Sequence, residues 1–376
     1  MKTQTFTHLL KRLSLAALFL STLIITAQEE PEKSWFDNVS LSGSVDGYYR
    51  YNIGAPNREF DTDTDGEPDT FLAPATSFAN RSGFSLGMAN IILGYEGEKV
   101  GFVADLVFGP RGEDAVFLSE GSSQIVNQLY VYWNVSEKFK LTFGNFNTFL
   151  GYEVISPVGN FNYSTSYMFS YGPFSHTGLK ADFTLSDKWS AMLAIMNPTD
   201  YTESNPFDTY IVGAQLGYTG DNGSAFLNFR YGNEGEPGEV GPTFQADLTT
   251  GWDLTEDFYL GINGTYLSTE PQDDGDTSGF YGIALYPQLK TSESFTIGLR
   301  GEYFSEYNFA LGAIGLDTEG DGSVIAATLT GSYEIGNLIL KPELRLDSAS
   351  EDTFFDNDLE LTKSLSSFVI GAIYKF

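Results

Sequence analysis

The feature that most limits the fold is a two-residue alternation of apolar and polar side chains, which recurs along the chain between turn-forming residues. The segment 39–53, VSLSGSVDGYYRYNI, places its valines and Leu41 on one face and its serines, Asp46 and Arg50 on the other. A period of two is that of a β-strand and not of a helix. The sequence therefore predicts an all-β fold.

Sixteen segments carry this pattern. The predicted strands are 39–53, 82–95, 100–109, 125–135, 139–150, 174–185, 189–197, 208–219, 224–232, 243–254, 258–268, 279–290, 295–305, 323–335, 338–348 and 364–376. Most are close to the ~9 to 11 residues of a tilted strand that crosses a bilayer. Pro287 and Pro342 lie inside two of them, where each removes a hydrogen-bond donor.

The connections between these strands alternate in length. Seven are tight turns, at 96–99, 136–138, 186–188, 220–223, 255–257, 291–294 and 336–337, and eight are longer, at 54–81, 110–124, 151–173, 198–207, 233–242, 269–278, 306–322 and 349–363. Bacterial outer-membrane barrels have an even number of strands, short periplasmic turns and long extracellular loops. We therefore predict a transmembrane, antiparallel, up-and-down β-barrel of about 16 strands.

The alternative is a large soluble all-β protein, such as a propeller or a double sandwich, whose strands also alternate. Closure in lipid is favoured, because a closed barrel leaves no strand edge unpaired and 16 strands leave room for an aqueous channel. The last predicted strand, SLSSFVIGAIYKF, ends on the aromatic Phe376. A terminal aromatic of this kind is similar to the assembly signal of outer-membrane barrels.

The first 27 residues have the pattern of a secretory signal peptide. Lys2, Lys11 and Arg12 precede the apolar run 13–25, which is shorter than a membrane-spanning helix. We expect cleavage after Ala27, a single barrel domain over 28–376, and export to the bacterial outer membrane. Because only residues 28–38 precede the first strand, we expect no plug domain and no energy-coupled transporter.

Charge and composition exclude other classes. The formal net charge is −30, and removal of the three basic leader residues leaves 17 basic and 50 acidic residues, or −33. Nucleic acid is therefore not an expected partner. The absence of cysteine excludes a disulfide-stapled domain or a lipid-anchored lipoprotein. Acidic loops on an aromatic-rich β body would explain the composition and would attract cations to the mouth.

One segment of the chain resembles the putative β-barrel porin-2 (OmpL-like) family. It begins at residue 141 and reads LTFGNFNTFLGYEVISPVGNFNYSTSYMFSYGPFSHTGLKADFTLSDKWSAMLAIMNPTD. The residues that carry the resemblance are Gly144, Phe146, Thr148, Gly151, Asn162, Tyr163, Ser164, Pro173, His176, Thr177, Gly178 and Asn197. Pro198 stands where a glycine is expected. The resemblance covers about 60 residues and implies a porin barrel, without a named substrate or catalytic residues.

Charged residues are predicted to face the interior. The candidate pore-lining residues are Asp46, Arg50, Lys180, Arg230, Asp247, Arg300, Glu302, Lys341, Glu343, Arg345 and Asp347, with His176 and Asp182 on the same face. A basic residue facing lipid would cost ~2 to 4 kcal/mol near the midplane. The charges either set a transverse field across an aqueous lumen or fill the interior with salt bridges, and the sequence does not separate these hypotheses. Under the first, neutralising Arg300 would shift selectivity toward cations.

Two long connections are candidate sites. Loop 151–173, the third long loop, is expected to fold into the channel as a constriction, by analogy with other 16-stranded porins; the alternative is an external loop that covers the rim. Asp61, Asp63 and Asp65, followed by Gly66, match the front half of a calcium loop, but Leu72 stands at the twelfth position. A solvated acidic loop is favoured over a calcium site, and no other cofactor is expected.

Three functions remain in view. The favoured one is a porin for passive diffusion of small polar or ionic solutes, surrounded by outer-membrane lipid. The second is a closed barrel whose loops bind a partner or serve an envelope assembly. The third, a barrel enzyme, is not expected, because the mature chain holds one histidine, His176, and no G-x-S-x-G motif. A homotrimer is expected only by analogy.

Overall fold

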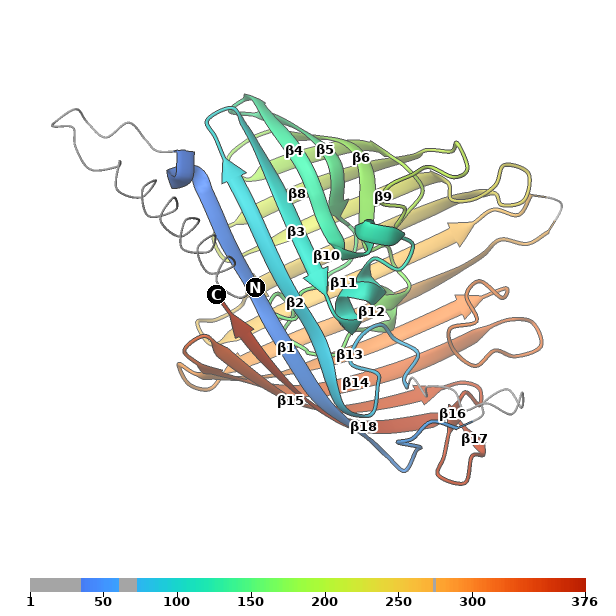
Figure 1. Ribbon diagram of the computed structural model, residues 1–376. Coiled ribbons are helices and arrows are strands. Elements are labelled where there is room, and N and C mark those ends of the chain that lie inside the picture. The colour runs from blue at the N-terminus through green and yellow to red at the C-terminus, as the bar shows by residue number, and fades with distance from the viewer. Residues whose placement is uncertain (1–34, 61–72, 273–274) are drawn as a thin grey trace, which may run out of the picture. The chain divides into compact units, whose positions relative to one another are not determined.

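The computed structural model describes residues 35–60, 73–272 and 275–376. Within the unit Ser40–Phe376, sixteen strands close into one antiparallel barrel, in which neighbours in sequence are neighbours in the sheet and β1 pairs with β18 (Figure 1). The barrel strands are β1 (Val39–Ile53), β2 (Gly83–Glu96), β3 (Val100–Phe108), β4 (Val126–Ser136), β5 (Phe139–Asn147), β6 (Ser175–Thr184), β7 (Trp189–Met196), β8 (Ile211–Gly220), β9 (Gly223–Asn233), β10 (Pro242–Asp253), β11 (Phe258–Thr269), β12 (Ser278–Lys290), β13 (Phe295–Tyr307), β14 (Gly322–Ile335), β15 (Leu338–Ala349) and β18 (Ser364–Lys375). The predicted strand count and closure are confirmed.

The remaining elements are short. They are η1 (Trp35–Asn38), α2 (Pro110–Ala115), η2 (Gly121–Ile125), α3 (Tyr167–Ser170) and the two-stranded sheet of β16 (Phe354–Phe355) and β17 (Leu361–Thr362). Apart from η1, which precedes β1, they interrupt connections that the alternation predicts as plain loops. Among the described residues, no helix is long and apolar enough to cross a membrane.

Strand β15 shows why the barrel is not a soluble sandwich. Its inward-facing side chains include Lys341, Glu343, Arg345 and Asp347, all of which are buried, while Leu344 and Leu346, which face outward, are about half exposed. A soluble protein buries its apolar face and exposes its charged one. The inverted pattern suits a wall with lipid outside and a polar interior.

The two prolines interrupt pairing on one side only. Pro287 pairs with Leu260 on β11, but the register with β13 is broken between Leu285 and Gln288. Pro342 likewise pairs with Ile370 on β18 and lies in a gap of the β14 pairing. A missing N–H therefore weakens one ladder at each site without ending the strand.

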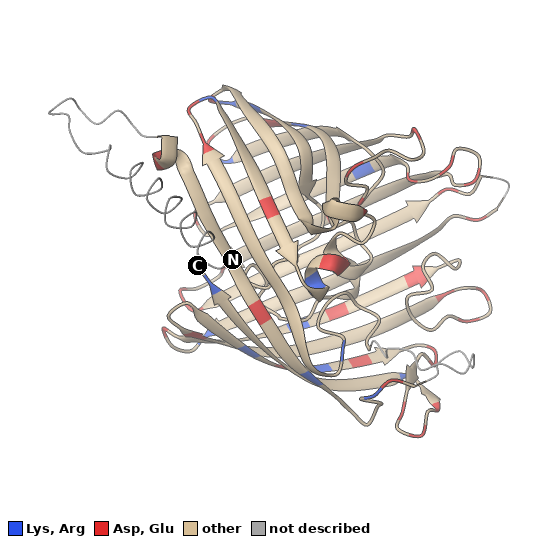
Figure 2. Ribbon diagram, viewed as in Figure 1, with Lys and Arg blue, Asp and Glu red and all other residues tan. Residues whose placement is uncertain are grey.

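Charged side chains gather at the two ends of the barrel. Figure 2 shows red and blue mainly in the short turns and the long loops, with fewer coloured positions along the strands. The seven tight turns lie at one end, which we call the short-turn end, and the long connections lie at the other, the long-loop end.

Candidate functional site

Loop 151–173 crosses the interior of the barrel. Its first residue, Gly151, donates its backbone N–H to Asp247 on β10 (3.0 Å). On the opposite wall, Lys341 of β15 donates to the carbonyl of Pro157 (2.8 Å). Both wall residues face inward. The prediction that this loop folds into the barrel is confirmed by these contacts, and the alternative of an external rim loop is wrong.

Two wall glutamates hold the backbone of this loop. Glu302 on β13 accepts hydrogen bonds from the N–H groups of Tyr167 (3.0 Å) and Met168 (2.8 Å), at the start of α3. Glu343 on β15 accepts from the N–H of Tyr163 at 2.8 Å, and also from Ser164. A carboxylate that accepts backbone N–H groups forms charge-assisted bonds, which are stronger than neutral ones. The two glutamates therefore act as anchors for the loop.

Two arginines bind loop carbonyls beside these anchors. Arg300 on β13 pairs with Glu153 (2.7 Å) and donates to the carbonyl of Ser164 (2.7 Å). Arg345 on β15 pairs with Asp347 (2.9 Å) and donates to the carbonyl of Thr165 (2.7 Å). Both guanidinium groups are fully buried. Their charges are compensated locally, as burial requires.

Neighbouring long loops hold loop 151–173 from the long-loop side. Arg111 in α2 donates to the carbonyls of Ile155 (2.8 Å) and Tyr163 (3.4 Å) and lies over the Tyr163 ring. Tyr171 donates its hydroxyl to the carbonyl of Ala75, and burial raises the pKa of this tyrosine to about 12. The hydroxyl therefore stays a donor at any physiological pH.

Glycines on the inner wall make room for the side chains of the loop. A Cβ atom at Gly371 on β18 would overlap the ring of Tyr163, and one at Gly282 on β12 would lie 2.7 Å from Met168. The same holds for Gly213 and Phe149, Gly261 and Tyr152, and Gly298 and Phe161. The wall and the loop are thus complementary in shape from β8 round to β18.

The predicted pore-lining residues all lie on interior-facing positions. Arg50, Arg230, Asp247, Arg300, Glu302, Lys341, Glu343, Arg345 and Asp347 are buried, whereas Asp46 and Lys180 are partly exposed. Asp46 accepts a hydrogen bond from the Tyr163 hydroxyl, Arg230 pairs with Glu234, and Lys180 lies 3.8 Å from Asp182. Most of these groups therefore bind loops or one another. Their contact with a passing solute stays a prediction.

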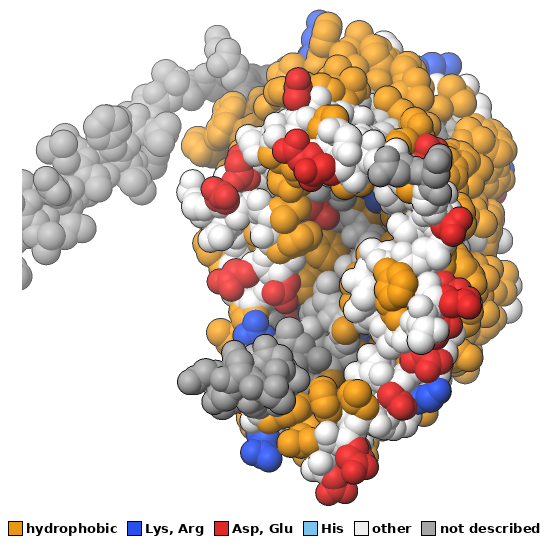
Figure 3. Space-filling model, turned by 90° about the vertical axis from the view of Figure 1, so that its right-hand side faces the viewer, with side chains coloured by type: hydrophobic (Ala, Val, Ile, Leu, Met, Phe, Trp, Pro, Cys, Tyr) orange, Lys and Arg blue, Asp and Glu red, His pale blue; other side chains and the backbone are white. Residues whose placement is uncertain are grey.

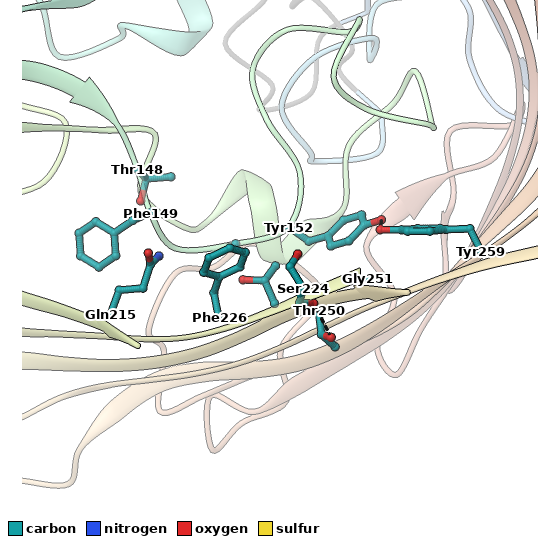
Figure 4. A pocket seen from close by; sticks show the side chains of 11 residues that line it. Thr148, Phe149, Tyr152, Gln215, Ser224, Phe226, Thr250, Gly251 and Tyr259 are labelled. Carbon is teal, nitrogen blue, oxygen red and sulfur yellow. Dashed lines mark hydrogen bonds between the residues drawn. The ribbon is translucent and has the colours of Figure 1, made fainter. Parts of the chain in front are cut away.

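Open space remains beside the opposite wall. A cavity of about 390 Å³, which we call the β8–β11 cavity, lies between the start of the loop and strands β8 to β11 (Figure 4). Its lining residues are Thr148, Phe149, Gly151, Tyr152, Gln215, Ser224, Phe226, Thr249, Thr250, Gly251 and Tyr259. None of them is charged, and the search for charged residues in the sequence therefore missed all of them.

Asp200 is a loop residue whose pKa lies near neutral pH. It lies in the loop after β7, is buried, and accepts the N–H groups of Phe174 (2.8 Å) and Ser175 (2.7 Å). Burial raises the pKa of Asp200 to about 7, although these two bonds and Arg230 oppose the shift. Its charge state therefore changes near neutral pH, at the point where loop 151–173 rejoins the barrel.

Comparison with protein families gives a match over residues 38–376, which is the whole barrel, to the model described as "Putative beta-barrel porin-2, OmpL-like". The chain belongs to this family. The family and the closed barrel together make it an outer-membrane porin-like protein, and they favour a channel over an enzyme. No curated protein matches the sequence.

Solved outer-membrane proteins share the fold of this porin-2 member at low identity. The anion-selective porin from Comamonas acidovorans is 12% identical, with a TM-score of 0.60, and the match covers 90% of this chain and 99% of that one. The outer membrane channel DcaP of Acinetobacter baumannii is 13% identical (TM-score 0.55; 90% and 97%). OmpT of Vibrio cholerae in its trimer form is 12% identical (0.54; 90% and 99%).

The residues that carried the porin-2 resemblance have identifiable structural roles. Thr148 and His176 are linked by a hydrogen bond (3.0 Å) that joins the loop start to β6, and His176 is buried. Gly144 and Gly178 pair across β5 and β6. At each, a Cβ atom would lie 2.7 Å from a Cα atom of the next strand. Asn162 donates to Thr330 on β14 (2.7 Å). The motif therefore describes how the loop is attached.

The long-loop end carries an acidic rim. Figure 3 looks onto this end and shows red side chains around a hollow. The exposed acidic residues of the long loops include Glu203, Asp208, Glu236, Glu239, Glu270, Asp276, Asp317, Glu319, Asp321, Asp352, Asp358 and Glu360. The predicted calcium ligands Asp61, Asp63 and Asp65, and the predicted signal peptide 1–27, lie outside the described residues.

Proposed function

We propose that this outer-membrane barrel is a porin that lets small polar or ionic solutes diffuse through a water-filled path narrowed by loop 151–173. The observation that carries the proposal is the placement of this loop, which lies against β13 to β15 and leaves the β8–β11 cavity on the other side. A loop held inside a barrel by a buried ion pair and charge-assisted hydrogen bonds sets the size of a path, which is what a diffusion channel needs.

The acidic rim supports a preference for cations over anions at the mouth. Exposed carboxylates surround the hollow at the long-loop end, and they concentrate cations within a Debye length of about 8 to 10 Å. We place this end outside the cell and the short turns in the periplasm, after export through the signal peptide 1–27. A homotrimer is part of the proposal by analogy with the trimer form of OmpT.

Planar-bilayer conductance of the purified mature protein tests the proposal. We expect stable ohmic current steps. Under a salt gradient, we expect the sign of the reversal potential to show that cations pass more readily than anions. Heat-unfolded protein in the same detergent is the control. If barrels whose folding is verified by gel mobility give no steps, the porin proposal fails, and the barrel whose loops bind a partner becomes the better hypothesis.

A further inference from the structure

We propose that the β8–β11 cavity is a binding subsite for a neutral polyhydroxylated solute, of which a short oligosaccharide is the type. The inference rests on the proposed porin function and names the class of solute. At about 390 Å³ the cavity lies within the range of small-ligand sites, roughly 300 to 1,000 Å³.

Aromatic rings supply the apolar part of the subsite. Figure 4 shows Phe149, Phe226, Tyr152 and Tyr259 spread along the cavity, from the start of the loop to β11. All four are partly exposed. The face of an aromatic ring is electronegative and attracts the C–H bonds on the apolar face of a sugar ring. A row of such rings suits a solute made of repeated sugar units.

Uncharged polar groups complete the lining. Gln215 donates its amide nitrogen to Asn228 (2.8 Å), and its amide oxygen has no hydrogen bond among the described residues. The hydroxyls of Tyr152 and Tyr259 lie 2.8 Å apart and share one hydrogen bond, so one hydroxyl proton is left to donate. An acceptor and a donor at separate points match sugar hydroxyls, which both donate and accept.

Charge is screened from this cavity. Asp247 on β10 accepts a hydrogen bond from the lining residue Gly151 and is 1% exposed. Its Oδ1 accepts from Gly151, Asn228 and Thr249 and its Oδ2 from Asn263 (2.7 to 3.3 Å), so this carboxylate is held by donors of the wall and the loop, and it is not among the residues that line the cavity. Anions meet the acidic rim before they reach the cavity. The lining therefore favours a neutral solute over either kind of ion.

Saturation-transfer NMR on the folded barrel in detergent tests binding directly, and it does not depend on conductance. The probes are maltotriose, the anionic trimer of galacturonic acid, and polyethylene glycol of similar mass. We expect saturation transfer to maltotriose only. In bilayers, maltotriose should interrupt the ion current in a concentration-dependent way, whereas the glycol should not.

The variant Phe226→Leu removes one ring from the cavity wall and keeps an apolar side chain. We expect its affinity for maltotriose to fall about two- to tenfold, a loss of about 0.4 to 1.4 kcal/mol at 1.4 kcal/mol per factor of ten. Phe229→Leu is the matched control, because Phe229 faces outward on the same strand and stacks on Phe244. If Phe226→Leu does not fold, Gln215→Met removes the amide instead and should weaken binding in the same way.

The outcomes separate the two proposals. Ohmic conductance without selective saturation of maltotriose overturns the subsite and leaves the porin intact. Equal interruption of the current by sugar and glycol also overturns it, because size alone would then explain the effect. Sugar binding to a folded barrel that conducts no ions supports the subsite and overturns the porin. Equal weakening by the Phe226 and Phe229 variants rejects this location.

Discussion

Arg300 on β13 and Glu153 in loop 151–173 form an ion pair of 2.7 Å in which both side chains are buried. The pair joins the wall to the loop across 147 positions of sequence. Arg300 also donates to Ser164 and Thr328, so its guanidinium is bound on several sides. The sequence-based hypothesis gave Arg300 a direct role in ion selectivity, whereas its contacts give it a role in holding the loop.

Removing one partner of this pair should free the loop. Arg300→Met leaves the Glu153 carboxylate buried without its partner, a change that costs about 3 to 5 kcal/mol. Since about 1.4 kcal/mol is a factor of ten, docking of the loop should weaken by at least about a hundredfold. We expect larger and noisier single-channel currents.

The exposed pair of Lys363 and Glu351 is the matched control for this change. Glu351→Gln should alter stability by less than about 1 kcal/mol and leave the current steps unchanged. If Arg300→Met changed ion selectivity while its step size and noise matched the unmodified protein, the arginine would face the conducting path, and the holding role would be wrong.

Gly371 should tolerate no larger side chain. In Gly371→Ala the new methyl group meets the ring of Tyr163, which is fully buried and lies against Tyr48. Overpacking of this kind costs about 1 to 3 kcal/mol. Urea unfolding of the barrel in lipid vesicles measures the loss. Gly301→Ala is the control and should be neutral, because nothing lies within 4 Å of its Cβ position.

The alternation predicted the strands well because each strand of this barrel separates lipid from a polar interior. On β15 every charged residue from Lys341 to Asp347 faces inward, so the pattern is read from neighbours in sequence. The alternation of short and long connections predicted the up-and-down topology of the barrel. Pro287 and Pro342 did not make the strand prediction wrong, because each interrupts the hydrogen-bond ladder on one side of its strand only.

The site was less accessible to sequence reasoning because its partners are far apart in the chain. Periodicity says that Glu343 faces inward, but not that it binds Tyr163, 180 positions away. The hydroxyls of Tyr152 and Tyr259 meet across 107 positions. Arg111 lies in a connection whose side chains do not alternate between apolar and polar, so no local sequence pattern predicts that it is buried. Tertiary packing alone decides which inward residues are covered and which line open space.

Strand orientation has its own test on β15. Leu344 faces outward near the middle of this strand and is 50% exposed. Leu344→Arg puts a charge into lipid at a cost of about 2 to 4 kcal/mol, whereas Ser348→Arg, on the same face at the end of the strand, should cost about 0 to 1 kcal/mol. Urea titration of folding into vesicles compares the two. Equal costs would mean that this face does not contact lipid.

Stability should depend on pH through Asp200. Its folded pKa of about 7 lies above the ordinary aspartate value of 3.8, so the group favours the folded state fully below pH 4, and this contribution is lost as pH rises to about 7. At 1.36 kcal/mol per unit, the loss is on the order of 4 kcal/mol. Arg230 and Glu234 are the charged groups that face it.

Asp200→Asn removes this dependence and keeps the fold of the loop. Asparagine tolerates the positive φ of 65° and can still accept the N–H groups of Phe174 and Ser175. We expect the variant to melt at a higher temperature than the unmodified protein at pH 8, and at the same temperature near pH 4. Asp208→Asn, at an exposed position with φ of 53°, should show no such divergence. Parallel melting curves for Asp200→Asn and the unmodified protein from pH 4 to 8 would mean that Asp200 is charged throughout and that its burial is compensated by Arg230.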